Sequence, residues 1–173
     1  LLTLGLTLGL LVKEPRTGVR RMGIACFGLV VFQGILGGLT VLWLLPLPVS
    51  VAHATMGQTF FTAIVLLATV LSPQWSASSG GWQIRPEDRG ITRASLAALA
   101  AVYAQLVLGA ALRHAGWHPA LVTAHLAGAV AAVFFCLRAT RGVLESGPAE
   151  LSGAARRIQW LVAAQLVLGA ATF

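Results

Sequence analysis

The chain has few charged residues and very few acidic ones. Of its 173 residues, 10% are charged, only 5 are Asp or Glu, and 57% are hydrophobic, with a mean hydropathy of +0.84. A soluble domain carries about 25% charged residues, so this chain lacks the polar side chains that would cover a globular surface. The scarcity excludes an ordinary soluble protein, and we expect an integral membrane protein.

Cysteine and membrane-embedded carboxylates are also scarce. Cys26 and Cys136 both lie inside apolar runs, which argues against a disulfide framework and indicates small packing residues. A single zinc site would more often draw on clustered Cys, His or carboxylate ligands. Catalytic carboxylate pairs are excluded from the apolar runs, because every acidic residue lies in a connection between runs: Glu14, Glu87, Asp88, Glu145 and Glu150.

Long apolar runs dominate the rest of the sequence. A helix needs about 20 apolar residues to cross a bilayer, and four full spans fit, at 22–44, 49–72, 94–112 and 119–137. Partial spans at 1–12 and 158–173 flank them. We therefore predict an all-α, polytopic membrane helical bundle. Because no signal peptide precedes the first run, we expect a fragment that begins and ends inside membrane helices.

The basic residues indicate a topology. Eleven of the 12 Lys and Arg residues fall in three alternate connections, at 13–21, 73–93 and 138–157. The positive-inside rule puts these connections in the cytoplasm, so the turns "LPLP" and "RHAGWHP" face outward. The net charge of +7 is then a topology signal, and we expect no nucleic-acid partner. Prolines are expected to keep 45–48 out of helix and to begin the span at 119.

The sequence contains an internal repeat. Gln33 precedes His53 by the same sequence distance at which Gln105 precedes His125. The alignment also matches three further pairs: Leu36 with Leu108, Gly37 with Gly109, and Ala52 with Ala124. Each copy is a helical hairpin, at 22–72 and 94–137, and a third copy begins at Gln165. We predict two halves, 1–72 and 94–173, joined by a cytoplasmic linker at 73–93.

The polar residues of the repeat are the candidate functional residues. Ionisable side chains inside a membrane usually serve function, and histidine is a common axial ligand of haem, so His53 and His125 are candidate iron ligands. A lone membrane histidine can instead only hydrogen-bond a neighbouring helix. Gln33 and Gln105 are read mainly as interhelical hydrogen-bond formers and less as cofactor contacts. The glycines at 34, 37, 38 and 109 would allow close helix approach or leave room for a macrocycle.

Two further histidines, His114 and His118, lie in the outer turn, where they are either solvated or in contact with a haem propionate. Of these, His114 is the weaker cofactor-binding candidate beside His125.

The segments "QGILGGLTV", "VAHATMGQ" and "QLVLGAALRH" make the chain resemble the haem A synthase family of cytochrome oxidase assembly. The similarity covers nearly the whole chain. It implies eight membrane helices in two similar halves, of which this chain would span the end of the second to the start of the seventh. It also implies an integral protein of a prokaryotic cell membrane. The outer turn lacks the Cys pair that many members carry.

The resemblance implies an iron-dependent oxidoreductase that converts haem O to haem A by oxidising a ring methyl to formyl. His53 would then be a ligand on the substrate-haem side, and His125 a ligand of a haem b cofactor. Their partner histidines and a catalytic carboxylate would lie outside these residues. We therefore expect the fragment to bind haem weakly and to be inactive alone.

Implied partners are the haem substrate, membrane lipid, an electron donor and haem O synthase, and self-association stays open. Two other functions also stay open. The chain could be a non-catalytic membrane haem b protein that transfers electrons, or a polytopic transporter whose histidines are structural.

Overall fold

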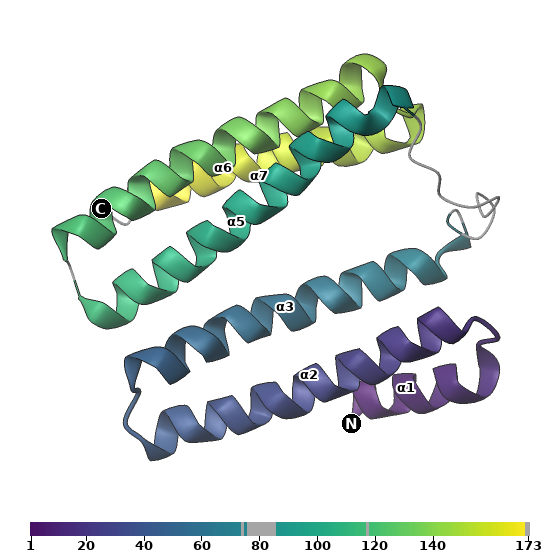
Figure 1. Ribbon diagram of the computed structural model, residues 1–173, viewed down its shortest axis with the longest axis horizontal. Helices are drawn as coiled ribbons and strands as arrows, with labels where there is room; N and C mark the ends of the chain where they lie inside the picture. Colours follow the sequence, from purple (N-terminus) through teal and green to yellow (C-terminus); the bar gives the residue numbers. More distant parts are fainter. Residues whose placement is uncertain (74, 76–85, 117, 172–173) are drawn as a thin grey trace. The chain divides into compact units, whose positions relative to one another are not determined.

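A computed structural model describes residues 1–73, 75, 86–116 and 118–171. Over these residues the chain is all-α, as predicted, and forms two compact units, Leu1–Trp82 and Gln83–Phe173 (Figure 1). The first unit contains α1 (Leu2–Lys13), α2 (Thr17–Leu42) and α3 (Leu47–Leu71). The second contains α5 (Arg89–Ala115), α6 (Pro119–Ser146) and α7 (Ser152–Ala171), with short 3₁₀ helices η1 (Pro86–Asp88) and η2 (Ala149–Leu151).

Four helices, α2, α3, α5 and α6, are long and apolar enough to cross a membrane. They form two hairpins, α2 with α3 and α5 with α6, whose helices pack side by side (Figure 1). Helices suit these sequences because hydrocarbon offers no partner for the backbone, so each N–H and C=O must be satisfied within the segment.

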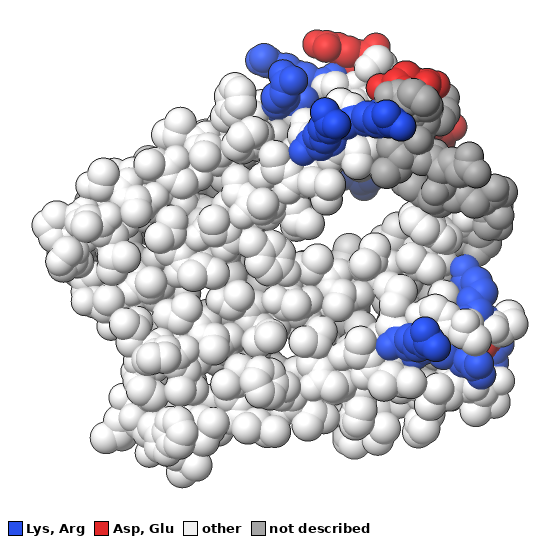
Figure 2. Space-filling model, in the orientation of Figure 1, with Lys and Arg blue, Asp and Glu red and all other residues white. Residues whose placement is uncertain are grey.

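Apart from Arg113, in the last turn of α5, the charged side chains among the described residues of each unit gather at one end of its hairpin. On the face drawn in Figure 2, Lys and Arg cluster where α2 and α5 begin, and the rest of each unit is uncharged. We call this the basic end of each hairpin. The opposite end, at residues 43–46 in the first unit and at Gly116 and His118 in the second, we call the His end. Basic side chains flank membrane helices because they reach the headgroup region and water.

The helices extend beyond the predicted spans at the basic end. The first full span was expected to begin at 22, but α2 begins at Thr17; the third was expected at 94, but α5 begins at Arg89. The C-terminus of α6 also lies at the basic end, and there α6 continues past the predicted limit of 137 to Ser146. Hydropathy marks only the hydrocarbon-embedded part, whereas Arg, Ala and Leu favour helix on either side of that boundary. Of the predicted linker 73–93, residues 74 and 76–85 lie outside the described residues.

The turn between α2 and α3, at the His end of the first unit, lies two residues earlier than expected, at 43–46 and not at 45–48. Pro46 stands outside the helix as its N-cap, but Pro48 lies within the first turn of α3, where its missing N–H costs nothing. The prediction that both prolines keep 45–48 out of helix was therefore wrong for 47 and 48. The turn itself places Leu44 and Leu45 at φ of 55° and 62°, in the left-handed region that disfavours side chains.

The two hairpins share one register. The offset from Thr17 to Arg89, the first residues of α2 and α5, equals the offset from Leu47 to Pro119, the first residues of α3 and α6. Burial follows the same offset. The buried residues Cys26 and Leu67 of the first unit are matched in the second by buried alanines, at 98 and 139. The alanines let α5 and α6 pack more closely than α2 and α3 do.

A further helix packs on each hairpin through a polar contact. The Thr7 hydroxyl of α1 donates a hydrogen bond to the Gly23 carbonyl of α2 at 3.0 Å. In the second unit the Gln159 amide of α7 donates to the Thr140 hydroxyl of α6 at 3.1 Å. Small or hydrogen-bonded residues at such crossings are typical of helices that associate in lipid.

An ion pair occupies the connection from α1 to α2. Arg16 Nε lies 2.7 Å from Glu14 Oε1, and Arg16 Nη1 donates a hydrogen bond to the Val70 carbonyl near the end of α3. The hydrogen bond from the Arg16 side chain lowers the pKa of Glu14 to about 2. The pair therefore stays ionised at physiological pH, and any stability it contributes is lost only in acid, as the pH falls through that value.

The strained turn predicts a stabilising substitution. The residue that matches Leu44 in the repeat is Gly116, which has the same sign of φ, 79°, and the Leu44 side chain is 89% exposed. Leu44→Gly should raise the free energy of unfolding by about 1 kcal/mol, because it removes the left-handed penalty and sacrifices little packing.

Thermal unfolding in detergent micelles measures this effect. The control Leu47→Gly, in the first helical turn of α3, should instead destabilise the hairpin. A loss of stability in both variants would show that the Leu44 conformation carries no strain.

The burial of residues along α3 predicts different effects for substitutions at two neighbouring leucines. Leu67 is 1% exposed and Leu66 is 51% exposed. Leu67→Ala should lower the free energy of unfolding by about 2 kcal/mol, because the cavity it leaves loses van der Waals contacts, whereas Leu66→Ala should change it little. Equal unfolding temperatures for the two variants would contradict the assigned core.

Candidate functional site

The two candidate histidines occupy matching places in the two hairpins. His53 lies six residues after Leu47 on α3, and His125 six residues after Pro119 on α6. With a rise of about 1.5 Å per residue, both stand about 9 Å inside the His end of their helix. Both side chains are half-buried. The equal depth follows from the helix starts, because α3 and α6 both begin six residues before the histidine, each with a proline in its first turn.

Each histidine ring packs against a glycine of the facing helix. A Cβ placed on Gly37 of α2 would lie 3.0 Å from Cε1 and 3.6 Å from Nδ1 of His53. A Cβ placed on Gly109 of α5 would lie 3.0 Å from Cε1 and 3.6 Å from Nδ1 of His125. The ring thus fills the space that the missing side chain leaves, and the two units repeat this contact at the same distances.

Only some of the predicted packing glycines serve this purpose. A Cβ on Gly34 or Gly38 would meet no atom within 4 Å, so these two do not mediate helix contact within the unit. Successive residues turn by about 100° around a helix, and Gly38 therefore faces away when Gly37 faces α3. The sequence showed a run of glycines but not which of them face α3.

The two glutamines both reach the helix that carries the histidine, as interhelical hydrogen-bond formers would. Gln33 Nε2 donates a hydrogen bond to the backbone carbonyl of His53 at 2.9 Å. Gln105 Nε2 lies 3.2 Å from Nε2 of the His125 ring. Gln33 thus bonds the backbone, whereas Gln105 bonds the imidazole itself. The repeat therefore preserves the Gln–His pairing but not the atom that is bonded.

Several polar atoms at these pairs are buried without a hydrogen-bond partner. They are Nδ1 of His53 and of His125, Oε1 of Gln33 and of Gln105, and the hydroxyl of Ser50. In contrast, Nε2 of His53 is not among the buried atoms and makes no hydrogen bond with the described residues. Unsatisfied buried polar atoms are costly, and their grouping at both histidines makes these positions the candidate functional site.

The other candidates lie apart from these pairs. His114, in the last turn of α5, and His118, the N-cap of α6, are both exposed at the His end. Among the described residues no group of three or more His, Cys, Asp and Glu side chains could hold a metal ion. A metal at this site would therefore depend on single histidines, as haem iron does.

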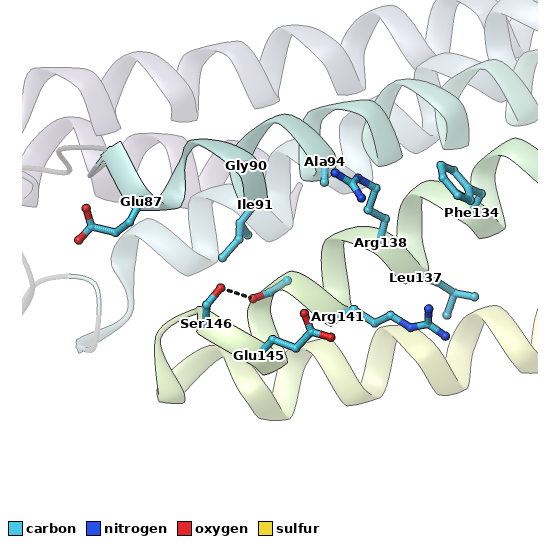
Figure 3. A pocket seen from close by; sticks show the side chains of 11 residues that line it. Glu87, Gly90, Ile91, Ala94, Phe134, Leu137, Arg138, Arg141, Glu145 and Ser146 are labelled. Carbon is cyan, nitrogen blue, oxygen red and sulfur yellow. Dashed lines mark hydrogen bonds between the residues drawn. The ribbon is translucent and has the colours of Figure 1, made fainter.

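A separate pocket of about 470 Å³ opens at the basic end of the second unit, between η1, α5 and α6 (Figure 3). Its charged lining comes from two arginines and two glutamates, and its apolar side from a phenylalanine and a leucine: Arg138, Arg141, Glu87, Glu145, Phe134 and Leu137. Arg138 lies about 20 Å beyond His125 along α6. The pocket is therefore not part of the histidine site.

Two residues of the site were missed by the sequence prediction. A Cβ on Gly57 of α3 would lie 2.9 Å from Gln33 Nε2, and one on Gly128 of α6 would lie 2.5 Å from Gln105 Oε1. These glycines make the room that lets each glutamine reach the opposite helix. The available signal was a glycine three or four residues after each histidine, on the same helical face.

The ring contacts predict opposite effects at neighbouring glycines. Gly38→Ala should stabilise the protein by up to about 1 kcal/mol, because alanine favours helix. Gly37→Ala should lack that gain and destabilise the hairpin by about 1 kcal/mol, because its Cβ would press on the His53 ring. Denaturant unfolding in detergent measures both, and Gly109→Ala should behave as Gly37→Ala does. A stabilising Gly37→Ala would mean that the ring is not held there.

Comparisons with protein-family models, with curated proteins and with solved structures find no match to this chain. The site is thus described by its geometry: two half-buried histidines at equal depth, each against a glycine and beside a glutamine of the facing helix.

Proposed function

We propose that the chain belongs to a haem A synthase-like membrane oxidoreductase, which oxidises a ring methyl of haem O to the formyl group of haem A. One observation carries the proposal: His53 and His125 stand at the same depth of two equivalent membrane hairpins, each with its ring against a glycine. Histidine is a regular axial ligand of protein-bound haem, and two such ligands in matched halves suit a protein with two haem sites.

The two rings fit an iron-binding role to different degrees. An iron ligand needs a ring nitrogen with a free lone pair. Nε2 of His53 makes no hydrogen bond with the described residues, whereas Nε2 of His125 is engaged by Gln105. In this proposal His53 holds the substrate haem O and His125 holds haem b. When bound, the haem iron supplies the redox chemistry of the reaction.

The protein itself limits the access of water to each histidine ring and holds each histidine in place. Both rings lie within the membrane-spanning helices and are half-buried, so water has limited access and hydrogen bonds to the rings are strengthened. Gln33 holds the backbone at His53 by a hydrogen bond to its carbonyl, and Gln105 holds the His125 ring by a hydrogen bond to Nε2. His114, exposed at the His end, could reach only the rim of a bound group, such as a propionate.

The proposal includes an orientation and partners. The four apolar helices make the chain a membrane-spanning protein. The connections at 13–21, 73–93 and 138–157 would face the cytoplasm of a prokaryotic cell, by the positive-inside rule. Haem O synthase would supply the substrate, and an electron donor would complete the redox cycle.

One observation favours a second candidate function, a haem b protein that only transfers electrons. All 5 acidic residues lie toward the basic end, in connections or terminal helical turns, so within each unit no Asp or Glu side chain stands beside the histidine of that unit. Electron transfer between haems needs haem ligands but no acid or base, whereas a reaction that transfers protons is accelerated by a positioned one.

A direct assay separates these functions. The protein encoded by the full gene, in membranes with an electron donor, should convert haem O to haem A, as measured by pyridine haemochrome spectra and chromatography of extracted haem. His53→Ala and His125→Ala should each lower conversion to below about a tenth, since even the loss of a group that only supports a metal ligand commonly costs roughly 10–100-fold. The control His118→Ala, at an exposed turn, should retain activity.

Each result of this assay supports a different function. Haem spectra without conversion would replace the enzyme with the electron-transfer protein. Absence of haem altogether would reject both, and would favour a transporter in which the histidines are structural.

A further inference from the structure

The two halves differ at one point in an otherwise repeated site. Gln33 and Gln105 are matched residues, and so are His53 and His125, yet the amide of Gln33 bonds a backbone carbonyl and that of Gln105 bonds an imidazole nitrogen. The glycine contacts of the two rings agree closely. The difference therefore comes from the glutamine side chains and not from a shift of the histidines.

The sequence explains why the glutamines diverge. Gln33 lies over Gly57, four residues after His53, whereas Gln105 lies over Gly128, three residues after His125. In the repeat, Gly128 is matched by Met56, and Gly57 is matched by Ala129. The glycine that leaves room for the glutamine is therefore displaced by one residue between the two hairpins, which is about 100° around the helix. Each glutamine side chain occupies the space beside the glycine of its own hairpin.

This divergence changes which nitrogen of each ring is free. The amide nitrogen of Gln105 can only donate, so in its contact with Nε2 of His125 we assign the ring Nε2 as the acceptor and place the ring proton on Nδ1. That Nδ1 is buried without a partner. His125 thus offers no free lone pair. His53 keeps its Nε2 without a hydrogen bond to the described residues and outside the buried set.

We propose that Gln105 masks the Nε2 lone pair of His125 in the ligand-free protein, while the corresponding nitrogen of His53 stays open. An electrophile or a metal ion then reaches His53 directly, but reaches His125 only after the Gln105 side chain turns away. For haem iron, a ligand that rests on the proposed function, the two sites load unequally, and the first hairpin accepts its ligand without displacing a protein group.

A purely structural glutamine would give a different result. If Gln105 only linked α5 to α6 by a hydrogen bond, its loss would weaken the packing of the two helices. It would not change the reactivity of His125 in particular. A mask predicts that reactivity of His125 rises when Gln105 is removed, although the fold becomes no looser. The reactivity of the four histidines in the same sample separates these cases.

Acylation by diethyl pyrocarbonate, which attacks the unprotonated imidazole nitrogen, tests the mask without any haem. The protein is modified in detergent, and the rate at each histidine is followed by peptide mass spectrometry. In the unaltered protein His53 should react faster than His125, with exposed His118 as the internal reference. One hydrogen bond corresponds to about a 2- to 10-fold change in an equilibrium, so Gln105→Leu should raise the His125 rate about 2- to 10-fold.

Matched variants make the result specific. Gly128→Ala should also raise the His125 rate, because its Cβ would lie 2.5 Å from Gln105 Oε1 and displace that side chain. Gln33→Leu and Gly57→Ala should leave the His53 rate within about 2-fold, because Gln33 bonds the backbone carbonyl of His53 and the ring makes no hydrogen bond with the described residues. Circular dichroism melting of every variant identifies any that lose the fold.

Two outcomes would overturn the mask. One is equal acylation of His53 and His125 in the unaltered protein, and the other is an unchanged His125 rate in folded Gln105→Leu and Gly128→Ala variants. Haem titration of the full gene product is a separate arm, in which Gln105→Leu should speed loading of the His125 site alone. If no haem binds, the proposed function is wrong. The acylation rates still show whether Gln105 masks the Nε2 lone pair of His125.

Discussion

The contact between a histidine ring and a glycine on the facing helix is the feature on which the rest of each hairpin depends. Lipid tails are as apolar as leucine, so helices in a membrane associate through close packing and hydrogen bonds rather than through the hydrophobic effect. Gly37 and Gly109 let α3 and α6 approach at the depth of the rings. The same contact holds each imidazole in place and sets the distance over which Gln33 and Gln105 must reach.

Much of this arrangement is predictable from the sequence, because its causes are local and repeated. Apolar runs of about 20 residues require helices, and prolines at 48 and 119 lie in the first turns of the two helices that carry the histidines. The constant offset between the two copies then equates His53 with His125, and it also equates Cys26 with Ala98 in the core. A duplicated sequence therefore indicates equal depth without any knowledge of the packing.

The remainder is not predictable, because it depends on helix phase and on helix propensity beyond the membrane. Hydropathy ends the last full span at 137, yet α6 continues through Arg138 and Arg141 to Ser146. Among neighbouring glycines only the helix rotation decides that Gly37 faces α3 and Gly38 does not. The left-handed turn at 44 was hidden for a related reason, since glycine marks that position only in the second copy, at 116.

Constraints of unequal strength explain how the two halves can diverge. A side chain at Gly37 or Gly109 would strike a ring that is packed between helices, so both copies keep glycine there. Gly57 and Gly128 contact only the ends of flexible glutamine side chains, which can turn elsewhere at small cost. A one-residue exchange of glycine at this second position therefore leaves the hairpin intact but changes the atom that the amide bonds. In a duplicated membrane site, such weakly constrained positions are where two identical ligands can acquire different chemistry.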